Sequence, residues 1–541
     1  MKRKIKYLIV LLSFSVTVYA QQNSVKKYFR QNLILADEFF QAENYAGALK
    51  IYNDLYAIDS LNIEVNYKLG VCMFNIYRKK TDLIKYFERS KVEYPESYYY
   101  LGRIYHLRMQ FNKALENYNK YKNSGKALIV SVDDLDFEMD KCYVAKKMII
   151  SPVDVEIVNA GDKINTSYPE YVPLVTGDES VMYFTSRRPG STGDKLDPNG
   201  EYFEDIYYSE YIDSAWSDVK QLGAPVNTPT HDACVALSID GNKMLIYRTD
   251  WALTGGDIYE TEFINGEWTK PVKLTDKINS KEGAETSAVY SPDQQTIYFS
   301  SNRPGGYGGK DIYRIKKMPD NTWSLPMNLG PVINTKYDED APFMHPDGVT
   351  LYFSSKGHKN MGGYDIFKSV KQENGWTTPE NLGYPINTVG DDIYFTLSVD
   401  GSHGYYSSDM HDTYGSSDIF IINMPKEENK YVILKGTVVS YDDGFKKLPA
   451  VITVIDYITK ELHGIYRTNS KTGKYLMVLQ PRRKYKIIVE SEGYHVLIDE
   501  IDMREKLRLE DLLKNIALKK IKPVSDKINN EEDSENSEID E

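Results

Sequence analysis

The amino-acid sequence predicts a multidomain α plus all-β protein, in which helical repeats precede a five-bladed β-propeller and a small β-sandwich. Three observations lead to this prediction. Apolar residues recur at helical spacing near the amino terminus, a strand pattern recurs five times in mid-chain, and a separate alternating stretch follows it. A chain of 541 residues is long enough for two to four independently packed units.

The first residues predict a secretory signal peptide over residues 1–20. The segment from Met1 to Lys6 carries four positive charges, and a mostly apolar run extends to Phe14. Val18-Tyr19-Ala20 then fits the small-residue rule for cleavage. A membrane anchor is the alternative, but the apolar run is short for a bilayer. We therefore expect an exported protein without a direct membrane span.

Charge and cysteine content exclude some classes of partner and site. Loss of the signal peptide changes the formal charge from −12 to −16, because its four positive charges leave with it. This acidic balance argues against nucleic acid as a partner. Cys72, Cys142 and Cys234 are far apart and lack metal-ligand spacing, so we expect buried thiols. A bridge between Cys72 and Cys142 is the alternative in an oxidising compartment.

Residues 25–150 predict helical repeats with a period of 32 to 34 residues. Small residues let paired helices approach, and aromatic residues fill the space between successive repeats. The spacing resembles that of tetratricopeptide repeats, which implies binding of peptides or proteins along a concave face. The clearest copy contains Tyr98, Leu101, Gly102, Tyr105, Ala114 and Tyr118.

Residues 153–425 predict the propeller. Asp-Ile followed by an aromatic residue begins at Asp205, Asp257, Asp311, Asp365 and Asp418, and each copy supplies four short antiparallel strands. The last copy lacks its final strand, and the segment from Val155 to Thr166 can complete it. We expect five blades, with six as the alternative. The repeated aspartates favour a structural role, in which each carboxylate accepts backbone hydrogen bonds.

The loops before each Asp-Ile pair differ between blades and are expected on one face of the propeller. Their basic and aromatic residues form a candidate docking face for an acidic or peptide partner, with a solvated loop set as the alternative. No catalytic or metal-ligating residues are predicted, because the eight histidines form no triad or metal arrangement. The candidate binding residues are Arg187, Arg188, Trp251, Arg303, Tyr307, His358 and His411.

The rest of the chain predicts a β-sandwich over residues 431–503, followed by a helical segment and a disordered acidic tail over residues 504–541. Alternating residues from Leu434 to Val439 start the sandwich, and Gly-x-Tyr and Gly-Tyr pairs mark turns leading into strands. This spacing resembles the carboxypeptidase regulatory-like domain.

The order of these modules resembles the multidomain OmpA-family envelope proteins of the type IX secretion system. The blades resemble the WD40-like (PD40) repeats of TolB-type periplasmic propellers. The resemblance implies a non-enzymatic scaffold without a cofactor, located in the periplasm and associated with the outer membrane. Its partners would be outer-membrane or periplasmic secretion subunits.

Two further expectations follow. In that family a carboxyl-terminal OmpA-like domain grips peptidoglycan, but this sequence ends where such a domain would begin. We therefore do not expect direct binding to peptidoglycan. A glycan-binding or enzymatic propeller that uses the variable loop face is the alternative function.

Overall fold

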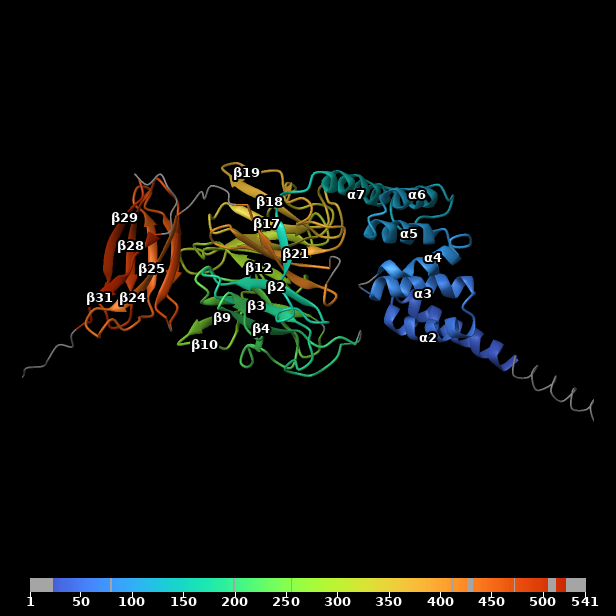
Figure 1. Ribbon diagram of the computed structural model, residues 1–541, viewed down its shortest axis with the longest axis horizontal. Helices are drawn as coiled ribbons and strands as arrows, with labels where there is room; N and C mark the ends of the chain where they lie inside the picture. Colours follow the sequence, from blue (N-terminus) through green and yellow to red (C-terminus); the bar gives the residue numbers. More distant parts are fainter. Residues whose placement is uncertain are drawn as a thin grey trace, which may run out of the picture.

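The computed structural model describes residues 23–77, 80–197, 200–253, 255–409, 413–425, 432–470, 472–504 and 512–521. The expected signal peptide over residues 1–20, the candidate residue His411 and the expected acidic tail beyond residue 521 lie outside these ranges. Helices occupy one end of the described chain, five antiparallel sheets the middle, and two further sheets the other end (Figure 1).

The amino-terminal region consists of helical hairpins. Residues 23–41 are helical. The helices that follow are α2 (Tyr45–Ile58), α3 (Ile63–Ile76), η1 (Lys80–Leu83), α4 (Ile84–Ser90), α5 (Glu96–Leu107), α6 (Phe111–Lys122) and α7 (Val132–Ile150). Asn44, Asn62 and Ser131 cap three of these helices by accepting a backbone N–H three residues later.

Small residues set the distance between paired helices, as the sequence predicts. At Gly102 on α5 a Cβ atom would come within 2.4 Å of the Tyr118 ring on α6. The fully buried Tyr118 therefore packs directly on the backbone of the neighbouring helix. All three cysteines are buried free thiols, so the alternative of a bridge between Cys72 and Cys142 is wrong.

Five antiparallel sheets follow and form a five-bladed propeller. The innermost strand of each blade packs beside that of the next, and β21 of the last blade packs beside β2 of the first. Blade 1 contains β2 (Glu170–Val175), β3 (Val181–Ser186), β4 (Asp205–Ile212), β5 (Ala215–Trp216) and β6 (Lys220–Gln221). Blade 2 contains β7 (Asp232–Leu237), β8 (Lys243–Thr249), β9 (Gly256–Ile264), β10 (Glu267–Trp268) and β11 (Val272–Lys273).

The remaining blades repeat this plan. Blade 3 contains β12 (Ser287–Tyr290), β13 (Thr296–Ser301), β14 (Asp311–Lys316) and β15 (Met327–Asn328). Blade 4 contains β16 (Glu339–Met344), β17 (Thr350–Ser355), β18 (Asp365–Gln372), β19 (Gly375–Trp376) and β20 (Glu380–Asn381). Blade 5 contains β21 (Asp392–Leu397), β22 (His403–Ser408), β23 (Asp418–Asn423) and the early strand β1 (Glu156–Asn159).

The ring closes as the sequence predicts. Strand β1 pairs antiparallel with β23, in register from Glu156 opposite Asn423 to Asn159 opposite Phe420. The first strand of the propeller therefore completes its last blade, and the described chain holds five blades. Closure leaves no open edge between the first and last blades.

A repeated asparagine fastens each blade to the connection that follows it. Asn334 accepts the backbone N–H of Ile312 at 2.8 Å and donates to the carbonyl oxygen of the same residue at 3.0 Å. The same pair of bonds joins Asn165, Asn227, Asn279 and Asn387 to Ile419, Ile206, Ile258 and Ile366. Each of these isoleucines directly follows a repeated aspartate, so the asparagine recurs together with the Asp-Ile pair.

Two sheets form the carboxyl-terminal sandwich. One contains β27 (Lys474–Leu479), β24 (Val432–Ser440), β30 (Leu512–Leu513) and β31 (Ile516–Leu518). The other contains β26 (Leu462–Arg467), β25 (Val451–Asp456), β28 (Lys484–Glu490) and β29 (Leu497–Asp502). Their inner faces share one apolar core that includes Ile452, Met477 and Ile487.

The prediction of a helical segment after residue 503 is wrong for the described residues there. Strands β30 and β31 pair parallel with β24, and Ile516 and Leu518 are buried in the sandwich core. The alternation of buried Ile516, exposed Ala517 and buried Leu518 has the period of a strand. The first sheet therefore gains its last strands from the segment predicted as a helix.

The sandwich packs against the propeller face that carries the Asp-Gly turns (Figure 1). Val399 and Ile239 of the propeller contact Leu476 and Val478 on β27. The backbone N–H of Arg467 donates to the Asp240 carboxylate at 2.9 Å. Among the described residues, no helix combines the length and the apolarity that crossing a lipid bilayer requires.

Candidate functional site

The candidate site is the loop face of the propeller, which we define by the connections between the second and third strands of each blade. In blades 1 to 5 these connections run over residues 187–204, 250–255, 302–310, 356–364 and 409–417. Because each joins equivalent strands of an equivalent blade, all five lie at the same end of the ring.

The predicted arginines of this face are engaged inside the propeller. Arg303 donates to the carbonyl oxygen of Ile278 at 2.7 Å and pairs with the buried carboxylate of Glu285 at 3.0 Å. Its guanidinium also lies over the Phe299 ring, 4.9 Å from the centroid. Arg188 makes the equivalent contacts with Glu170 in blade 1. These side chains are held by contacts inside the propeller and are not free to bind a partner.

Blade 2 reaches the same arrangement from a different position. Arg248 lies within β8 and pairs with the fully buried Asp232 at the start of β7. Counted from the acid that it pairs with, Arg248 lies two residues earlier in the repeat than Arg188 and Arg303 do. Arg248 favours the ionised form of Asp232, whereas burial favours the neutral form. Burial is the larger effect and raises the pKa of Asp232.

Arg187 neutralises the acidic cluster beside it. It pairs with Asp197 and Glu201, each at 2.6 Å, and donates to the carbonyl oxygen of Tyr202. The two carboxylates thus bind a guanidinium. Among the described residues no group of three or more metal-ligating side chains could hold an ion.

His358 is also turned inward. Its Nε2 is 2.9 Å from the carbonyl oxygen of Ile333, and its ring packs against Phe353 and Phe367. Burial lowers the pKa of His358, which keeps the imidazole neutral at pH 7. His411 lies outside the described residues.

The repeated aspartates accept backbone amides at the loop ends, as the sequence predicts. Asp311 accepts from the N–H groups of Tyr307 at 2.6 Å and Gly308 at 3.1 Å. Asp205, Asp365 and Asp418 accept equivalent amides in their own blades. Asp257 differs, because it pairs with Lys273 at 2.9 Å. The aspartates therefore shape the loops that carry the candidate residues.

Trp251 and Tyr307 are the predicted residues that the structure leaves exposed, with 77% and 52% of their surface accessible. Three apolar or aromatic residues of the same loop set are exposed with them: Leu196, Leu253 and Tyr414. We call these five residues the loop-face arc. They belong to the loops of blades 5, 1, 2 and 3, which are consecutive around the ring.

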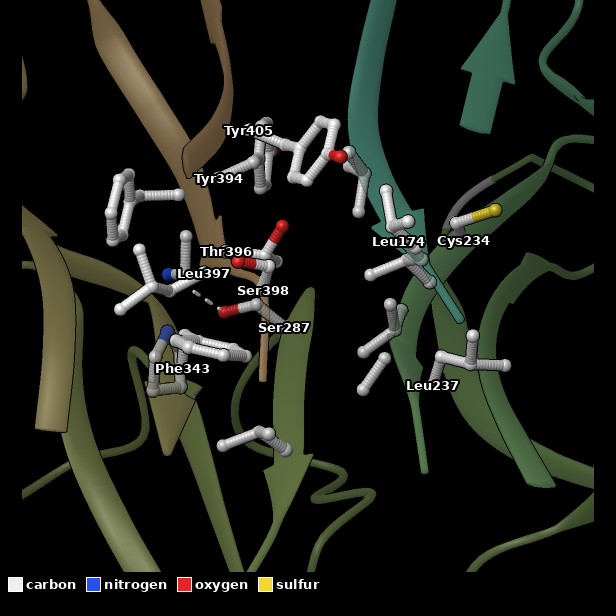
Figure 2. A pocket seen from close by; sticks show the side chains of 18 of the residues that line it. Leu174, Cys234, Leu237, Ser287, Phe343, Tyr394, Thr396, Leu397, Ser398 and Tyr405 are labelled. Carbon is white, nitrogen blue, oxygen red and sulfur yellow. Dashed lines mark hydrogen bonds between the residues drawn. The ribbon is translucent and has the colours of Figure 1, made fainter. Parts of the chain in front are cut away.

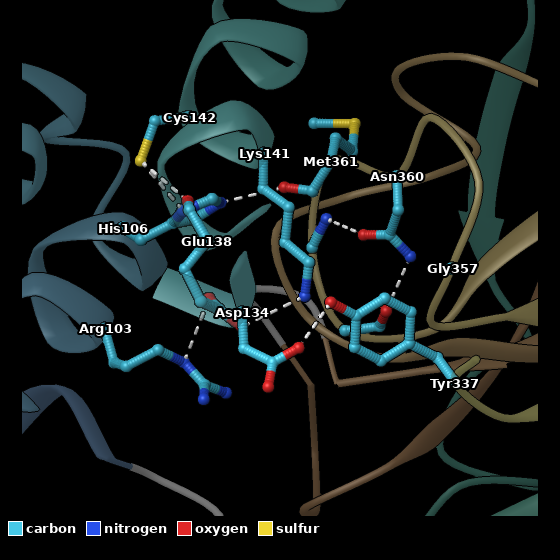
Figure 3. A network of polar contacts seen from close by, with 12 residues as sticks. Arg103, His106, Asp134, Glu138, Lys141, Cys142, Tyr337, Gly357, Asn360 and Met361 are labelled. Atoms are coloured by element: carbon cyan, nitrogen blue, oxygen red, sulfur yellow. Dashed lines mark hydrogen bonds and ion pairs between the residues drawn. The ribbon is translucent and has the colours of Figure 1, made fainter. Parts of the chain in front are cut away.

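The loop of blade 4 is covered by the helices of the same chain. Figure 3 shows Met361 and Asn360 of this loop beside His106 on α5 and Lys141 on α7. His106 Nε2 is 2.8 Å from the carbonyl oxygen of Met361, and the Met361 side chain is fully buried in the helical core. One of the five loops is thus part of an intramolecular interface.

A second contact joins α7 to the connection between blades 3 and 4. The rings of Phe137 and Tyr337 stack with centroids 4.6 Å apart. Asp134 accepts from the Tyr337 hydroxyl and from Lys336, each at 2.9 Å (Figure 3). Together with Met361, these contacts fix the orientation of the helices relative to the propeller.

The junction is polar but neutral where it is most deeply buried. Burial lowers the pKa of His106 to about 4 and raises the pKa of Cys142 to about 12, so both groups are uncharged at pH 7. The Cys142 sulfur lies 3.2 Å from His106 Nδ1. Glu138 contacts Arg103 at 3.5 Å and Lys141 at 3.2 Å; burial raises its pKa, but these cations outweigh that effect and lower it.

Sequence reasoning missed both the internal role of the arginines and the junction residues. A signal for the first exists, because Arg188 and Arg303 each follow a glutamate by 18 residues, the spacing of a repeated internal pair. No repeat pattern marks Met361 or Phe137, and Tyr337 shares its position in the repeat with Tyr168, which makes no such contact with the helices in the bonds and ring contacts given above. Their role in the junction depends on where α7 packs against the propeller.

No family model and no curated protein matches this sequence. Among solved structures, a thermostable family-43 glycoside hydrolase is 15% identical with a TM-score of 0.33, and covers 48% of this chain and 90% of its own. The α-L-arabinofuranosidase from Lactobacillus brevis is 16% identical with a TM-score of 0.32, over 49% and 94% of the two chains.

The endo-arabinase from Bacteroides thetaiotaomicron is 16% identical with a TM-score of 0.33, over 50% of this chain and 98% of its own. At such TM-scores the likeness carries no argument about the activity or ligands of this chain. The assignment of five blades rests on the strand pairing described above.

Proposed function

We propose that this protein is a non-enzymatic scaffold that holds partner proteins in the periplasm, in association with the outer membrane. In this proposal the helical hairpins act as tetratricopeptide repeats, the propeller is of the WD40-like TolB type, and the sandwich is a carboxypeptidase regulatory-like domain. The partners would be subunits of a type IX secretion or related envelope machine.

The loop-face arc is the observation that supports this proposal most strongly. Trp251 and Tyr307 expose large side chains on loops whose backbones are held by internal hydrogen bonds. Exposed aromatic residues on a fixed framework are typical of protein-binding hot spots. The predicted basic residues of the face do not support the proposal, because Arg187, Arg188 and Arg303 pair with acids of the propeller.

The junctions at both faces of the propeller also favour a scaffold. The helices are fixed through Met361 and Tyr337, and the sandwich through Val399 and Asp240. A partner on the helices and a partner on the loop-face arc would then be held on neighbouring surfaces in one relative orientation. Such positioning requires no catalytic group.

Affinity purification from cross-linked cells that make the protein tests this proposal. The wild-type chain should recover envelope proteins, and the double variant Trp251→Ala and Tyr307→Ala should lose at least one of them. A matched control is Ile458→Ala, an exposed residue of the sandwich. Recovery of the wild-type chain alone would contradict the scaffold proposal, and identical partners for all three chains would contradict the role of the loop-face arc.

A further inference from the structure

The imidazole of His106 lies where the helices meet the propeller (Figure 3). Its Nε2 is 2.8 Å from the carbonyl oxygen of Met361 in the loop of blade 4, and its Nδ1 is 3.2 Å from the Cys142 sulfur on α7. Because a carbonyl oxygen can only accept, Nε2 donates its hydrogen to Met361, and Nδ1 is left to accept the thiol hydrogen of Cys142. The neutral ring therefore uses both nitrogens to join α5, α7 and this loop.

Protonation of the ring would break this arrangement. An imidazolium carries a hydrogen on both nitrogens, and the hydrogen on Nδ1 would face a sulfur, which is a weak acceptor. Two cations act on the ring, Arg103 from α5 and Lys141 from α7, against the single carboxylate of Glu138. Burial is the largest effect and lowers the pKa of His106 to about 4, although Met361 and Glu138 favour the charged form. The closed junction therefore excludes the proton at neutral pH.

We propose that this junction is an acid-sensitive latch: when His106 takes up a proton, the loop of blade 4 is released and the helices swing away from it. The second contact, in which Phe137 stacks on Tyr337 and Asp134 accepts hydrogen bonds, stays intact in weak acid, because side-chain hydrogen bonds lower the pKa of Asp134 to about 2. The helices then pivot on α7 and remain attached. Opening uncovers Met361 and adds the loop of blade 4 to the accessible loop face. The latch does not depend on the proposed function.

One carboxyl at the released loop responds to acid in the opposite direction. Asp365 accepts the N–H of Met361 at 2.8 Å, and burial raises its pKa to about 7. Asp205 holds the equivalent position in blade 1, outside the junction, and burial raises its pKa to about 6. Opening should therefore lower the pKa of Asp365 by about one unit, so acid favours the closed state through this group by at most about tenfold.

His106 has the larger effect. In the open state its ring is exposed and regains the ordinary pKa of 6.5, whereas the pKa in the closed state is about 4. The closed state therefore keeps its full stability above pH 6.5 and loses stability as the pH falls towards 4. After the opposing effect of Asp365, the ratio of open to closed molecules should rise about tenfold between pH 7 and pH 4.5.

The centre of the propeller provides a fixed reference for this movement. Its central cavity has a volume of about 70 Å³, and Figure 2 shows Leu174 and Leu237 on one side with Phe343 opposite. None of the described residues that line this cavity carries a carboxyl group or an imidazole, so acid places no charge on its walls. Buried carboxyls such as Glu339, whose pKa is raised to about 7, are neutral in weak acid and tolerate burial better in that form. We therefore expect the propeller to stay folded at pH 4.5.

Single-molecule energy transfer on the full chain tests the latch, with dyes attached through Glu116→Cys on α6 and Asp320→Cys in blade 3. Both positions are exposed, whereas the three native cysteines are buried. Wild type should show a second transfer population whose ratio to the first rises about tenfold from pH 7 to pH 4.5. An unchanged ratio, or loss of the far-ultraviolet helical signal over the same range, would overturn the proposal.

Variants of the chain assign the response to one histidine. His106→Gln should remove the rise, because an amide can bond to Met361 and Cys142 without taking up a proton. The matched control is His358→Gln, since His358 lies in the same loop but bonds to Ile333 inside the propeller, and this variant should respond as wild type does. A rise that persists in His106→Gln, or that disappears in His358→Gln, would contradict the role of His106.

A second pair of variants tests the latch should His106→Gln fail to fold. Lys141→Met removes a cation that disfavours the imidazolium, so the pKa of His106 in the closed state should increase and the acid response should shrink severalfold. Lys147→Met, at an exposed position of the same helix, should leave the response as it is. Equal responses in these two variants would overturn the proposal.

Discussion

A single buried polar residue fastens each blade to the connection that follows it. Asn334 is almost completely buried and makes hydrogen bonds to both backbone groups of Ile312 and to Asn328. Replacement by alanine would leave these backbone groups without partners inside the propeller, where water cannot replace the lost bonds.

We therefore expect Asn334→Ala to lower the free energy of unfolding by about 2 kcal/mol. Denaturant-induced unfolding, followed by far-ultraviolet circular dichroism, measures this change. The control is Asn423→Ala, because Asn423 is exposed and should cost less than about 0.5 kcal/mol. Equal losses in the two variants would contradict the role assigned to the repeated asparagine.

Buried carboxyls make the stability of the propeller depend on pH. Burial raises the pKa of Glu339 to about 7, above the value of about 4.3 in an unfolded chain. The folded state therefore binds more protons than the unfolded state between these values. The stabilisation from the protonated group is complete below about pH 4 and is lost as the pH rises through about 7.

Glu339→Gln should remove this dependence. The amide oxygen can accept the Thr335 N–H, and the amide nitrogen can donate to the hydroxyls of Thr335 and Ser355. The unfolding free energy of the variant relative to wild type should rise by on the order of 2 kcal/mol between pH 5 and pH 8. The same difference for the exposed Glu380→Gln, or a constant difference for Glu339→Gln, would contradict this assignment.

At the scale of elements, helix α7 determines how the helices sit on the propeller. Its Phe137 stacks on Tyr337, and its Asp134 accepts hydrogen bonds from Tyr337 and Lys336. The stack contributes about 0.5–1.5 kcal/mol beyond area burial. Removal of the Tyr337 ring should therefore loosen the junction without unfolding either module.

Double electron–electron resonance, which measures the distance between spin labels at Glu116 on α6 and Asp320 in blade 3, would detect this change. We expect Tyr337→Ala to broaden the distance distribution relative to wild type. Tyr441→Ala removes an exposed ring of the sandwich and should leave the distribution as it is. Unchanged width in Tyr337→Ala would mean that this stack does not fix the helices.

The repeated elements could be predicted from sequence, because equivalent backbone groups in each blade are bonded by the same types of residue at the same spacing. The pairing of β1 with β23 followed from an incomplete last copy. Strands β30 and β31 could not be predicted in this way, since they pair parallel with β24 across a long sequence separation. The internal pairing of the predicted docking arginines was missed for another reason. In a sequence, an arginine in a loop looks the same whether its side chain faces solvent or pairs with a buried glutamate.

At the scale of the whole molecule, three modules follow one another in a line, with the propeller between the helices and the sandwich (Figure 1). Each propeller face meets one neighbouring module, through Met361 and Tyr337 on one side and Val399 on the other. The loop face is therefore only partly available, and its available part displays the loop-face arc. We therefore expect a partner protein to bind there.

Site-specific photo-crosslinking in intact cells tests this claim most directly. A photoreactive phenylalanine analogue is placed at Trp251 or Tyr307, and at the exposed Ile458 of the sandwich as control. We predict that both loop-face positions give the same discrete adduct with one envelope protein and that Ile458 does not. Absence of any adduct at Trp251 and Tyr307, or the same adduct from Ile458, would contradict the claim.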